Sequence, residues 1–255
     1  MIYNKLSIIL LTQIASQPND TTDSQIAYYI LNHLDTIQND SISELAIKCN
    51  VSNSSISRFC RNIGLNDFSE LKEGLNDQSF KFEVVSNSND MKTRTIDHYS
   101  KVQESIKEVA QSIDTKVLLE LVKDIHQYKQ VTLLGLLKAS SAAINLQVDL
   151  LMLGKLVNVK LTYNDQLEFI SHANQNDLVI IFSYTGAYFD QGLRFTKNLN
   201  NIPKIYLISG NVCEENPYIY KNICFSSKLD QSSHPYQLIF VSSLIAQEYN
   251  HFKKD

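Results

Sequence analysis

The sequence predicts an α + α/β protein, in which an N-terminal helical domain is joined to a C-terminal domain with a parallel sheet. The chain has 255 residues, which is enough for two domains at a typical size of roughly 150 residues. Up to about residue 75, apolar residues recur only at helical spacing. From about residue 131, short apolar runs alternate with helical patterns, which is typical of a parallel sheet covered by helices.

The composition is that of an ordinary globular protein. Apolar residues make up 44% of the chain and charged residues 20%, which excludes a wholly disordered chain. The net charge of −4 gives no overall basic signature for nucleic acid, and no run reaches the roughly 18 apolar residues of a membrane span. The four cysteines form no CxxC pair. A reducing cytoplasm, without a membrane partner, is therefore the expected location.

Two helices are expected before residue 40. The first is indicated by Leu6, Leu10 and Ile14, which repeat at helical spacing. The second covers residues 25–37, where apolar residues form one stripe behind a group of capping residues. Both patterns predict packed helices in a domain that extends over residues 1–75.

Two shorter helices follow, and their spacing predicts a helix-turn-helix motif. Ser41 and Glu44 have the spacing of a capping box, which opens a short helix with one apolar face. After a break, Ser52 or Asn53 caps a second helix with the same apolar spacing, and Gly64 ends it. Two short helices joined by a tight turn are the plan of this DNA-binding motif.

The outward face of the second helix carries side chains that suit DNA reading. Amides can pair with adenine, guanidinium groups with guanine or phosphate, and hydroxyls with either. Residues 52–66 include no acid and carry a charge of +2, although residues 1–75 together carry −3. The candidate DNA-binding residues are Ser52, Asn53, Ser54, Ser55, Ser57, Arg58 and Arg61. A helical protein-binding module with a solvated polar face is the alternative.

The rest of the chain is expected to form a linker and then an α/β domain. Asn, Asp, Ser and Gln cluster in residues 76–98, which favours a linker with a short ordered piece at 80–85. The second domain is expected over residues 99–255. Its expected helices cover 99–128, 139–153, 187–199 and 235–252, and its expected strands cover 131–135, 156–161, 178–183, 205–209 and 223–225.

The best candidate for a binding loop directly follows the most apolar of these strands. Ligands of open parallel sheets bind at the carboxyl ends of strands, and hydroxyls beside the N–H groups of a helix start suit a phosphate. The expected ligand-binding residues of this loop are Ser183, Tyr184, Thr185, Gly186 and Tyr188. A helix start capped by its own Ser and Thr, without a ligand, is the alternative.

These runs resemble the RpiR/MurR family of bacterial regulators. In the first domain the resemblance rests on ISELA at 42–46, VSNSSISRFCR at 51–61, and IGL and FSELK within 63–72. In the second, residues 115–250 resemble a sugar isomerase (SIS) domain, and SYTGAY at 183–188 is similar to its phosphate-binding loop. The resemblance implies DNA binding through the helix that starts near Ser52. It also implies a SIS-like domain that dimerises and senses a phosphorylated sugar.

The first loop of the SIS-like domain departs from the family pattern GxGxS. The pattern begins at Gly135, but Leu137 stands at its second glycine and Ala139 at its ligand serine. Leu137 would crowd the approach of the backbone to a phosphate, which glycine permits. Gly135, Lys138 and Ser140 remain candidate ligand-binding residues. The pocket is expected to be partly degenerate, so that it binds a different ligand, binds weakly or serves only dimerisation.

We expect a DNA-binding transcriptional regulator of sugar or amino-sugar metabolism rather than an enzyme. An isomerase needs a general base that is positioned next to its substrate. The sequence instead favours a helix start for His234 and a solvated helix cap for Glu214 and Glu215. We therefore expect no catalytic residue, and no metal or cofactor. The expected partners are a double-stranded DNA operator, a phosphorylated sugar effector and further copies of the chain in a homodimer or tetramer.

Two alternatives remain open at this point. The first is a phosphosugar isomerase with an appended helical domain, which turnover of a sugar phosphate would support. The second is a ligand-blind DNA-binding dimer, whose melting temperature would not respond to sugar phosphates.

Overall fold

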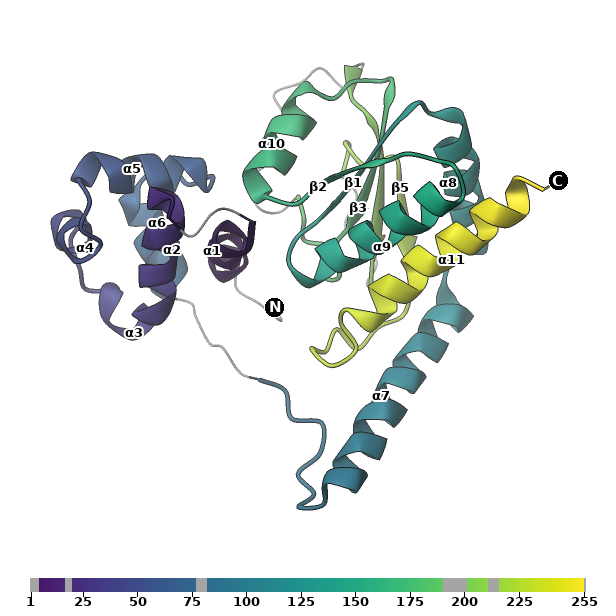
Figure 1. Cartoon of the computed structure of the whole chain (residues 1–255), viewed down its shortest axis with the longest axis horizontal. Coiled ribbons are helices and arrows are strands. Elements are labelled where there is room, and N and C mark those ends of the chain that lie inside the picture. Colours follow the sequence, from purple (N-terminus) through teal and green to yellow (C-terminus); the bar gives the residue numbers. More distant parts are fainter. Residues whose placement is uncertain (1–4, 17–19, 77–81, 190–200, 211–215, 255) are drawn as a thin grey trace. The chain divides into compact units, whose positions relative to one another are not determined.

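The computed structural model describes residues 5–16, 20–76, 82–189, 201–210 and 216–254 (Figure 1). The chain divides into two compact units, one of residues 3–81 with 161–168 and one of residues 82–160 with 169–255. Up to residue 76 the structure holds α1 (Lys5–Ser16), α2 (Thr22–Asn32), α3 (Leu34–Ile37), α4 (Ile42–Lys48), α5 (Asn53–Asn62) and α6 (Phe68–Asn76).

The helical unit is held together by a small apolar core. Ile9 of α1, Ile30 of α2, Phe59 of α5 and Leu71 of α6 are all fully buried. Burying such side chains contributes roughly 1.5–3 kcal/mol each. The apolar stripes seen in the sequence are therefore the faces by which these helices pack.

One predicted helix is interrupted. The sequence predicts a single helix over residues 25–37, but α2 ends at Asn32 and α3 begins at Leu34. The ring nitrogen Nδ1 of His33 lies 2.8 Å from the carbonyl oxygen of Tyr29, which the His33 N–H would otherwise use in a continuous helix. The His33 N–H donates to Ile30 instead, at 3.1 Å. The side chain thus replaces a backbone bond, and the helix breaks there.

The second unit is built around a five-stranded parallel sheet. From residue 82 on, the described elements are α7 (Met91–Ser112), α8 (Thr115–Gln127), β1 (Gln130–Gly135), α9 (Lys138–Met152), β2 (Asn158–Lys160), α10 (Tyr163–His172), β3 (Asp177–Phe182), β4 (Lys204–Ser209), β5 (Lys221–Cys224) and α11 (Tyr236–Phe252). All strand pairs are parallel, in the order β2-β1-β3-β4-β5. The predicted fold class, a helical domain followed by a parallel-sheet α/β domain, is confirmed.

Helices cover both faces of this sheet. On one face, Leu133 and Ile180 pack in a cluster with residues of α8, α9 and α11, and Figure 1 shows α9 and α11 side by side on this face. On the other face, Leu134 and Ile181 pack with Ile170 of α10. Because successive strand residues point to opposite faces, a strand buried on both sides is apolar throughout. The run at 178–183 predicted this for β3.

The first helix of the second unit begins earlier than predicted. Helices are expected from Tyr99, but α7 starts at Met91. The carboxylate of Asp90 accepts from the N–H of Thr93 at 2.9 Å and from its hydroxyl at 2.7 Å, and so caps the helix. The first turns of α7 bury almost no apolar residue, so this helix start left no hydrophobic period in the sequence.

Some expectations fall outside the described ranges. Most of the predicted helix 187–199 does, as do Glu214 and Glu215. No helix within the described ranges is both long enough and apolar enough to cross a bilayer.

Candidate nucleic-acid interface and ligand loops

Helix α4, the first of the helix-turn-helix pair, begins with the predicted capping box. The hydroxyl of Ser41 accepts from the N–H of Glu44 at 3.2 Å, and the carboxylate of Glu44 accepts from the N–H of Ser41 at 2.7 Å. The hydrogen bonds from Ser41 hold the pKa of Glu44 below its ordinary value. The box fixes where α4 starts and therefore where the turn after it lies.

The turn between α4 and α5 is closed by a left-handed residue. Asn50 has a φ of 55°, which Asn tolerates better than most residues. Its N–H donates to Ile47 at 3.0 Å, and the N–H of Val51 donates to Ala46 at 2.9 Å, as in a Schellman motif. Of the two predicted caps for α5, the structure selects Ser52, whose hydroxyl accepts from the N–H of Ser55 at 3.1 Å.

Helix α5 separates an apolar face from a polar one. Ile56, Phe59 and Cys60 are fully buried, and burial raises the pKa of the Cys60 thiol to about 12. The predicted DNA-binding residues lie off this buried face, with Asn53, Ser54, Arg58 and Arg61 exposed and Ser57 half-buried. The spacing read from the sequence thus brings the predicted residues to one accessible surface.

Several of these polar side chains already have partners. The amide of Asn53 donates to the hydroxyl of Ser43 at 2.9 Å, and the Nε of Arg61 donates to the carbonyl of Ser57 at 3.3 Å. The side chain of Arg58, in contrast, makes no hydrogen bond or ion pair with any residue that the structure describes. Among these three side chains, that of Arg58 is therefore the one without a polar partner in the described part of the chain.

The two predicted ligand loops follow adjacent strands. Gly135, the last residue of β1, pairs in register with Phe182, the last residue of β3. The sheet order reverses here, because β2 lies on one side of β1 and β3 on the other. Ligands of open α/β sheets bind at such a switch point. The structure therefore brings the starts of the two loops together.

In the first loop, the backbone at Leu137 has a conformation that glycine favours, although Leu137 replaces the second glycine of the family pattern. Leu137 has φ 48° and ψ −117°, and the N–H of Ala139 donates to the carbonyl of Leu136 at 3.0 Å. These are the features of a type II′ turn, whose first central position favours glycine. Gly135 itself is required, because a Cβ there would lie 2.8 Å from the carbonyl of Ala139.

The candidate side chains of the first loop point to different partners. The hydroxyl of Ser140 donates to the carbonyl of Leu137 at 2.6 Å, while Ala139 is buried. The ammonium of Lys138 lies 3.4 Å from the carbonyl oxygens of Gln231 and His234, in the segment before α11. Lys138 therefore extends from the first loop toward the start of α11.

The second loop combines an open turn with a buried tyrosine. The N–H of Gly186, which has a φ of 78°, donates to the carbonyl of Ser183 at 2.9 Å. Tyr184 is buried, and its hydroxyl bonds to Ser227 at 2.7 Å and to Gln237 at 2.9 Å. Burial raises the pKa of this phenol. The hydroxyl of Tyr184 is thus engaged in hydrogen bonds inside the protein.

Two aromatic contacts define the surroundings of this loop. The ring of Tyr184 stacks on His234 with 4.4 Å between centroids. Tyr188 is buried in the apolar cluster on the opposite face of the sheet, edge-on to Phe189 at 5.3 Å. Ser183, Thr185 and Gly186 are the predicted residues of this loop that stay partly exposed.

A pocket adjoins Lys138, and sequence reasoning missed most of its residues. It has a volume of about 490 Å³ and is lined by residues 82–86, Arg94, His98, Lys138, Gln231, Ser232 and 234–236. We call residues 82–86 the strap. Three stretches that are distant in the sequence meet here: residues 82–98, Lys138 and residues 231–236. The only signal in the sequence was the short ordered piece expected at 80–85.

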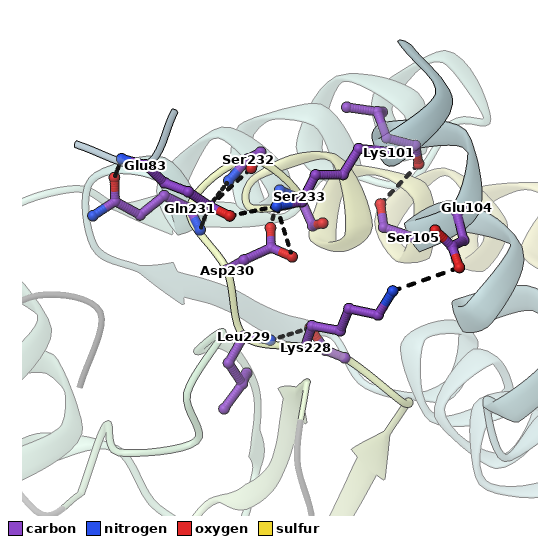
Figure 2. A network of polar contacts seen from close by, with 12 residues as sticks. Glu83, Lys101, Glu104, Ser105, Lys228, Leu229, Asp230, Gln231, Ser232 and Ser233 are labelled. Carbon is purple, nitrogen blue, oxygen red and sulfur yellow. Dashed lines mark hydrogen bonds and ion pairs between the residues drawn. The ribbon is translucent and has the colours of Figure 1, made fainter. Parts of the chain in front are cut away.

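The strap is held in place by Glu83 (Figure 2). Its carboxylate forms an ion pair with Lys101 and accepts from the N–H of Gln231 at 2.8 Å and from the hydroxyl of Ser232 at 2.9 Å. Burial raises the pKa of Glu83, but the bonds from Lys101 and Ser232 outweigh it and lower this pKa to about 2. Glu83 is thus a charged anchor at neutral pH.

Comparison with known proteins adds to this geometry. Residues 8–81 match the model of a helix-turn-helix domain of the rpiR family. The HTH-type transcriptional regulator HexR of Pseudomonas aeruginosa is 26% identical over 184 residues, which cover 69% of this chain. The match spans 65% of HexR, slightly less than two thirds of that protein's length.

Two solved structures share the fold. The Vibrio vulnificus NanR protein complexed with ManNAc-6P has a TM-score of 0.53 at 16% identity, over 98% of this chain and 93% of NanR. The sugar isomerase domain of an RpiR transcription factor from Sphaerobacter thermophilus has a TM-score of 0.53 at 16% identity, over 63% of this chain and 91% of that domain.

Proposed function

We propose that the chain is a regulator of the rpiR family, whose helix-turn-helix model matches residues 8–81, and that it binds an operator in double-stranded DNA and regulates genes of sugar or amino-sugar metabolism. The observation that carries the proposal is the exposed polar face of α5, opposite a fully buried apolar face, within the segment that matches the family model. Such a regulator acts where the DNA is, so the proposed location is the cytoplasm.

We propose that α5 is the recognition helix. Arg58 and Arg61 would contact bases or phosphates, and Asn53, Ser54 and Ser57 would contact base edges. Ser52 and Ser55 sit at the helix start, where their hydroxyls hold the cap, and would lie near the DNA backbone. Arg58 supports the assignment best, because no residue in the described part of the chain neutralises it.

We further propose that the regulator is a homodimer or a tetramer of such dimers. Exposed apolar residues recur on α9 at Ile144, Val148, Leu151 and Met152, which is helical spacing on one face. A second copy of the chain would cover this stripe. A dimer presents two recognition helices to half-sites about 34 Å apart. Doubling the contacts compensates for the −3 charge of residues 1–75.

The α/β unit is proposed to sense a phosphorylated sugar. Ser183, Thr185 and Gly186 stand at the switch point of the sheet beside Gly135, where hydroxyls and backbone N–H groups suit a phosphate. NanR, which shares the fold, is complexed with the phosphorylated sugar ManNAc-6P. Ser140 and Lys138 would contribute from the first loop. Tyr184 and Tyr188 would support the second loop from inside.

A regulatory role is proposed in preference to catalysis. Isomerisation needs a general base with a pKa near the working pH. Burial and the neighbouring Lys138 lower the pKa of His234 to about 4, which makes it a weak base at neutral pH. HexR, the relative described above, is named a transcriptional regulator.

Two measurements on the full chain test this proposal. Selection from a pool of random DNA duplexes should enrich one motif with the wild type, and Arg58→Ala should enrich it weakly or not at all. Thermal melting against N-acetylmannosamine 6-phosphate, glucose 6-phosphate and fructose 6-phosphate should show a shift with at least one sugar, which Ser183→Ala should reduce. Failure of the wild type to enrich any motif would contradict the DNA-binding assignment.

A further inference from the structure

The pocket beneath the strap has the size and charge of a small-molecule site. Its volume of about 490 Å³ lies within the range of roughly 300–1,000 Å³ that is usual for ligand pockets. Arg94 and Lys138 bring a guanidinium group and an ammonium group to its lining. Glu83 is the acid of that lining, and its carboxylate is already bound by Lys101, Gln231 and Ser232. The lining therefore favours an anion.

The guanidinium of Arg94 has N–H donors beyond the one that its hydrogen bond to Ser88 uses. One of its terminal nitrogens donates to the carbonyl of Ser88 at 2.8 Å, and it forms no ion pair with an acid in the described ranges. A guanidinium group has five N–H donors in a planar fork that matches phosphate oxygens. Since Arg94 is exposed, an anion can reach it without first displacing a buried partner.

His234 supplies a second, independent observation. Its ring lines the pocket and is only 6% exposed, yet its Nδ1 is buried and has no hydrogen-bond partner among the described residues. Buried polar atoms without a partner are rare in folded proteins, so this nitrogen is a hydrogen-bonding group that no other described residue uses. The ring also stacks on Tyr184, which belongs to the second ligand loop.

We infer that this pocket binds the phosphate group of a small phosphorylated molecule through Arg94 and Lys138. The strap forms one wall of the pocket and transmits the effect of binding along the chain to the helical unit. The inference rests on the proposed function, because the occupant is taken to be the effector. The phosphate of the effector would then lie at Arg94 and Lys138 and not at the two loops, and the Arg94→Ala and Ser183→Ala variants distinguish these two placements. Lys138 connects the two places, since it belongs to the first loop and lines the pocket.

The strap suits this role because of its place in the chain. It lies between α6, the last helix of the helical unit, and α7 of the α/β unit. Glu83 fixes it to the segment before α11, whose residues Gln231 and Ser232 also line the pocket. A ligand that touches both the strap and this segment changes the free energy of the anchored state. An effector shifts an equilibrium only by such a difference in affinity between two states.

Binding is tested first, on the full chain. The probes are glucose 6-phosphate, N-acetylmannosamine 6-phosphate and inorganic phosphate, and the readout is the melting temperature as a function of probe concentration. Arg94→Ala should weaken the binding of any active probe at least about tenfold. Lys92→Ala is the matched control, because Lys92 is an exposed cation in the first turn of the same helix that does not line the pocket.

Each outcome of this test decides the inference. Weaker binding by Arg94→Ala with normal binding by Lys92→Ala supports it. Equal binding by both variants overturns it, and loss of binding in Ser183→Ala alone would then leave the proposed effector function intact at the loops. No binding of any probe overturns the inference, while the selection of a DNA motif still tests the regulator assignment separately.

The coupling is tested with the active probe and the selected DNA motif. Lys101→Ala removes the ion pair that holds Glu83 but leaves the pocket lining unchanged, so probe binding should stay within about threefold of the wild type, while the probe should change DNA affinity much less than in the wild type. Glu104→Ala is the control, because Glu104 is an exposed acid whose ion pair with Lys228, at 3.5 Å, does not involve the strap. Hydrogen exchange of residues 82–90 should slow when the probe binds. An unchanged effect of the probe on DNA affinity in Lys101→Ala would overturn the role of the strap.

Discussion

Glu83 and Gln231, which are 148 positions apart, hold each other by two hydrogen bonds. The carboxylate of Glu83 accepts from the N–H of Gln231 at 2.8 Å, and the N–H of Glu83 donates to the Oε1 of Gln231 at 3.2 Å. Figure 2 shows both residues beside Ser232 and Asp230. Because backbone and side chain are both bound, the strap cannot leave this position without breaking several bonds at once.

The first prediction concerns the pH dependence of this anchor. The pKa of Glu83 is about 2 in the folded chain, below its ordinary value of 4.5. A lowered pKa stabilises the folded state fully above pH 4.5, and the contribution disappears as the pH falls from 4.5 to about 2. Glu83→Gln should therefore lower the free energy of unfolding by about 1–3 kcal/mol at pH 7.

Urea unfolding of the wild type and Glu83→Gln at a series of pH values measures this effect. The difference in free energy of unfolding between the two proteins should shrink as the pH falls below 4.5. A difference that stays constant from pH 7 to pH 2.5 would show that the Glu83 charge does not contribute.

The second prediction concerns α5, the proposed recognition helix. Arg58→Ala should weaken binding to the selected DNA motif by roughly 1–3 kcal/mol if Arg58 contacts a base, which is about 5–150-fold. Fluorescence anisotropy of labelled duplex without effector measures it. Arg94→Ala, which removes the same charge from the other unit, should bind DNA as the wild type does. Equal losses in both variants would indicate a general charge effect rather than base reading.

The third prediction concerns the strained turn of the first loop. Leu137→Gly should stabilise the protein by about 1 kcal/mol, because relief of roughly 1–3 kcal/mol of strain at positive φ exceeds the 0.5–1 kcal/mol entropic cost of glycine. The melting temperature should rise by about 2–4 °C. Leu136→Gly, at the preceding position of the same turn, should lower it. A lower melting temperature for Leu137→Gly would mean that its side-chain packing outweighs the strain.

The fourth prediction concerns assembly. Val148→Glu places a charge in the exposed apolar stripe of α9 and should shift the protein to a monomer in analytical ultracentrifugation. Because one recognition helix then acts alone, DNA affinity should fall at least about tenfold. Leu119→Glu makes the same change at an exposed position of α8 and should leave the assembly intact. A dimer that persists in Val148→Glu must use another face.

The sheet was largely predictable because its signal is local. The apolar run at 178–183 predicted β3, observed at Asp177–Phe182, since a strand covered on both faces has to be apolar at each position. The end of α9 before Gly154 could equally be predicted from the sequence. Gly154 has a φ of 80°, a conformation that glycine adopts without strain.

The pocket and the direction of single side chains were not predictable in this way. Arg94, Lys138 and His234 come together only because three parts of the chain pack against one another. The sequence next to each residue gives no sign of this pocket. The break at His33 depends on one ring competing for a backbone carbonyl. Tyr188 reads as a hydroxyl donor in a polar loop, yet its ring is buried in an apolar cluster.

The bond between Glu83 and Gln231 also sets an order of events during synthesis. At about 5–20 residues per second, the ribosome needs roughly 7–30 s to add the 148 residues between them. The helical unit up to residue 76 emerges well before that bond can form, because domains fold as they emerge, N-terminal first. Each new molecule can therefore complete helices α1 to α6 before it can anchor the strap, so the proposed control by an effector would be acquired last.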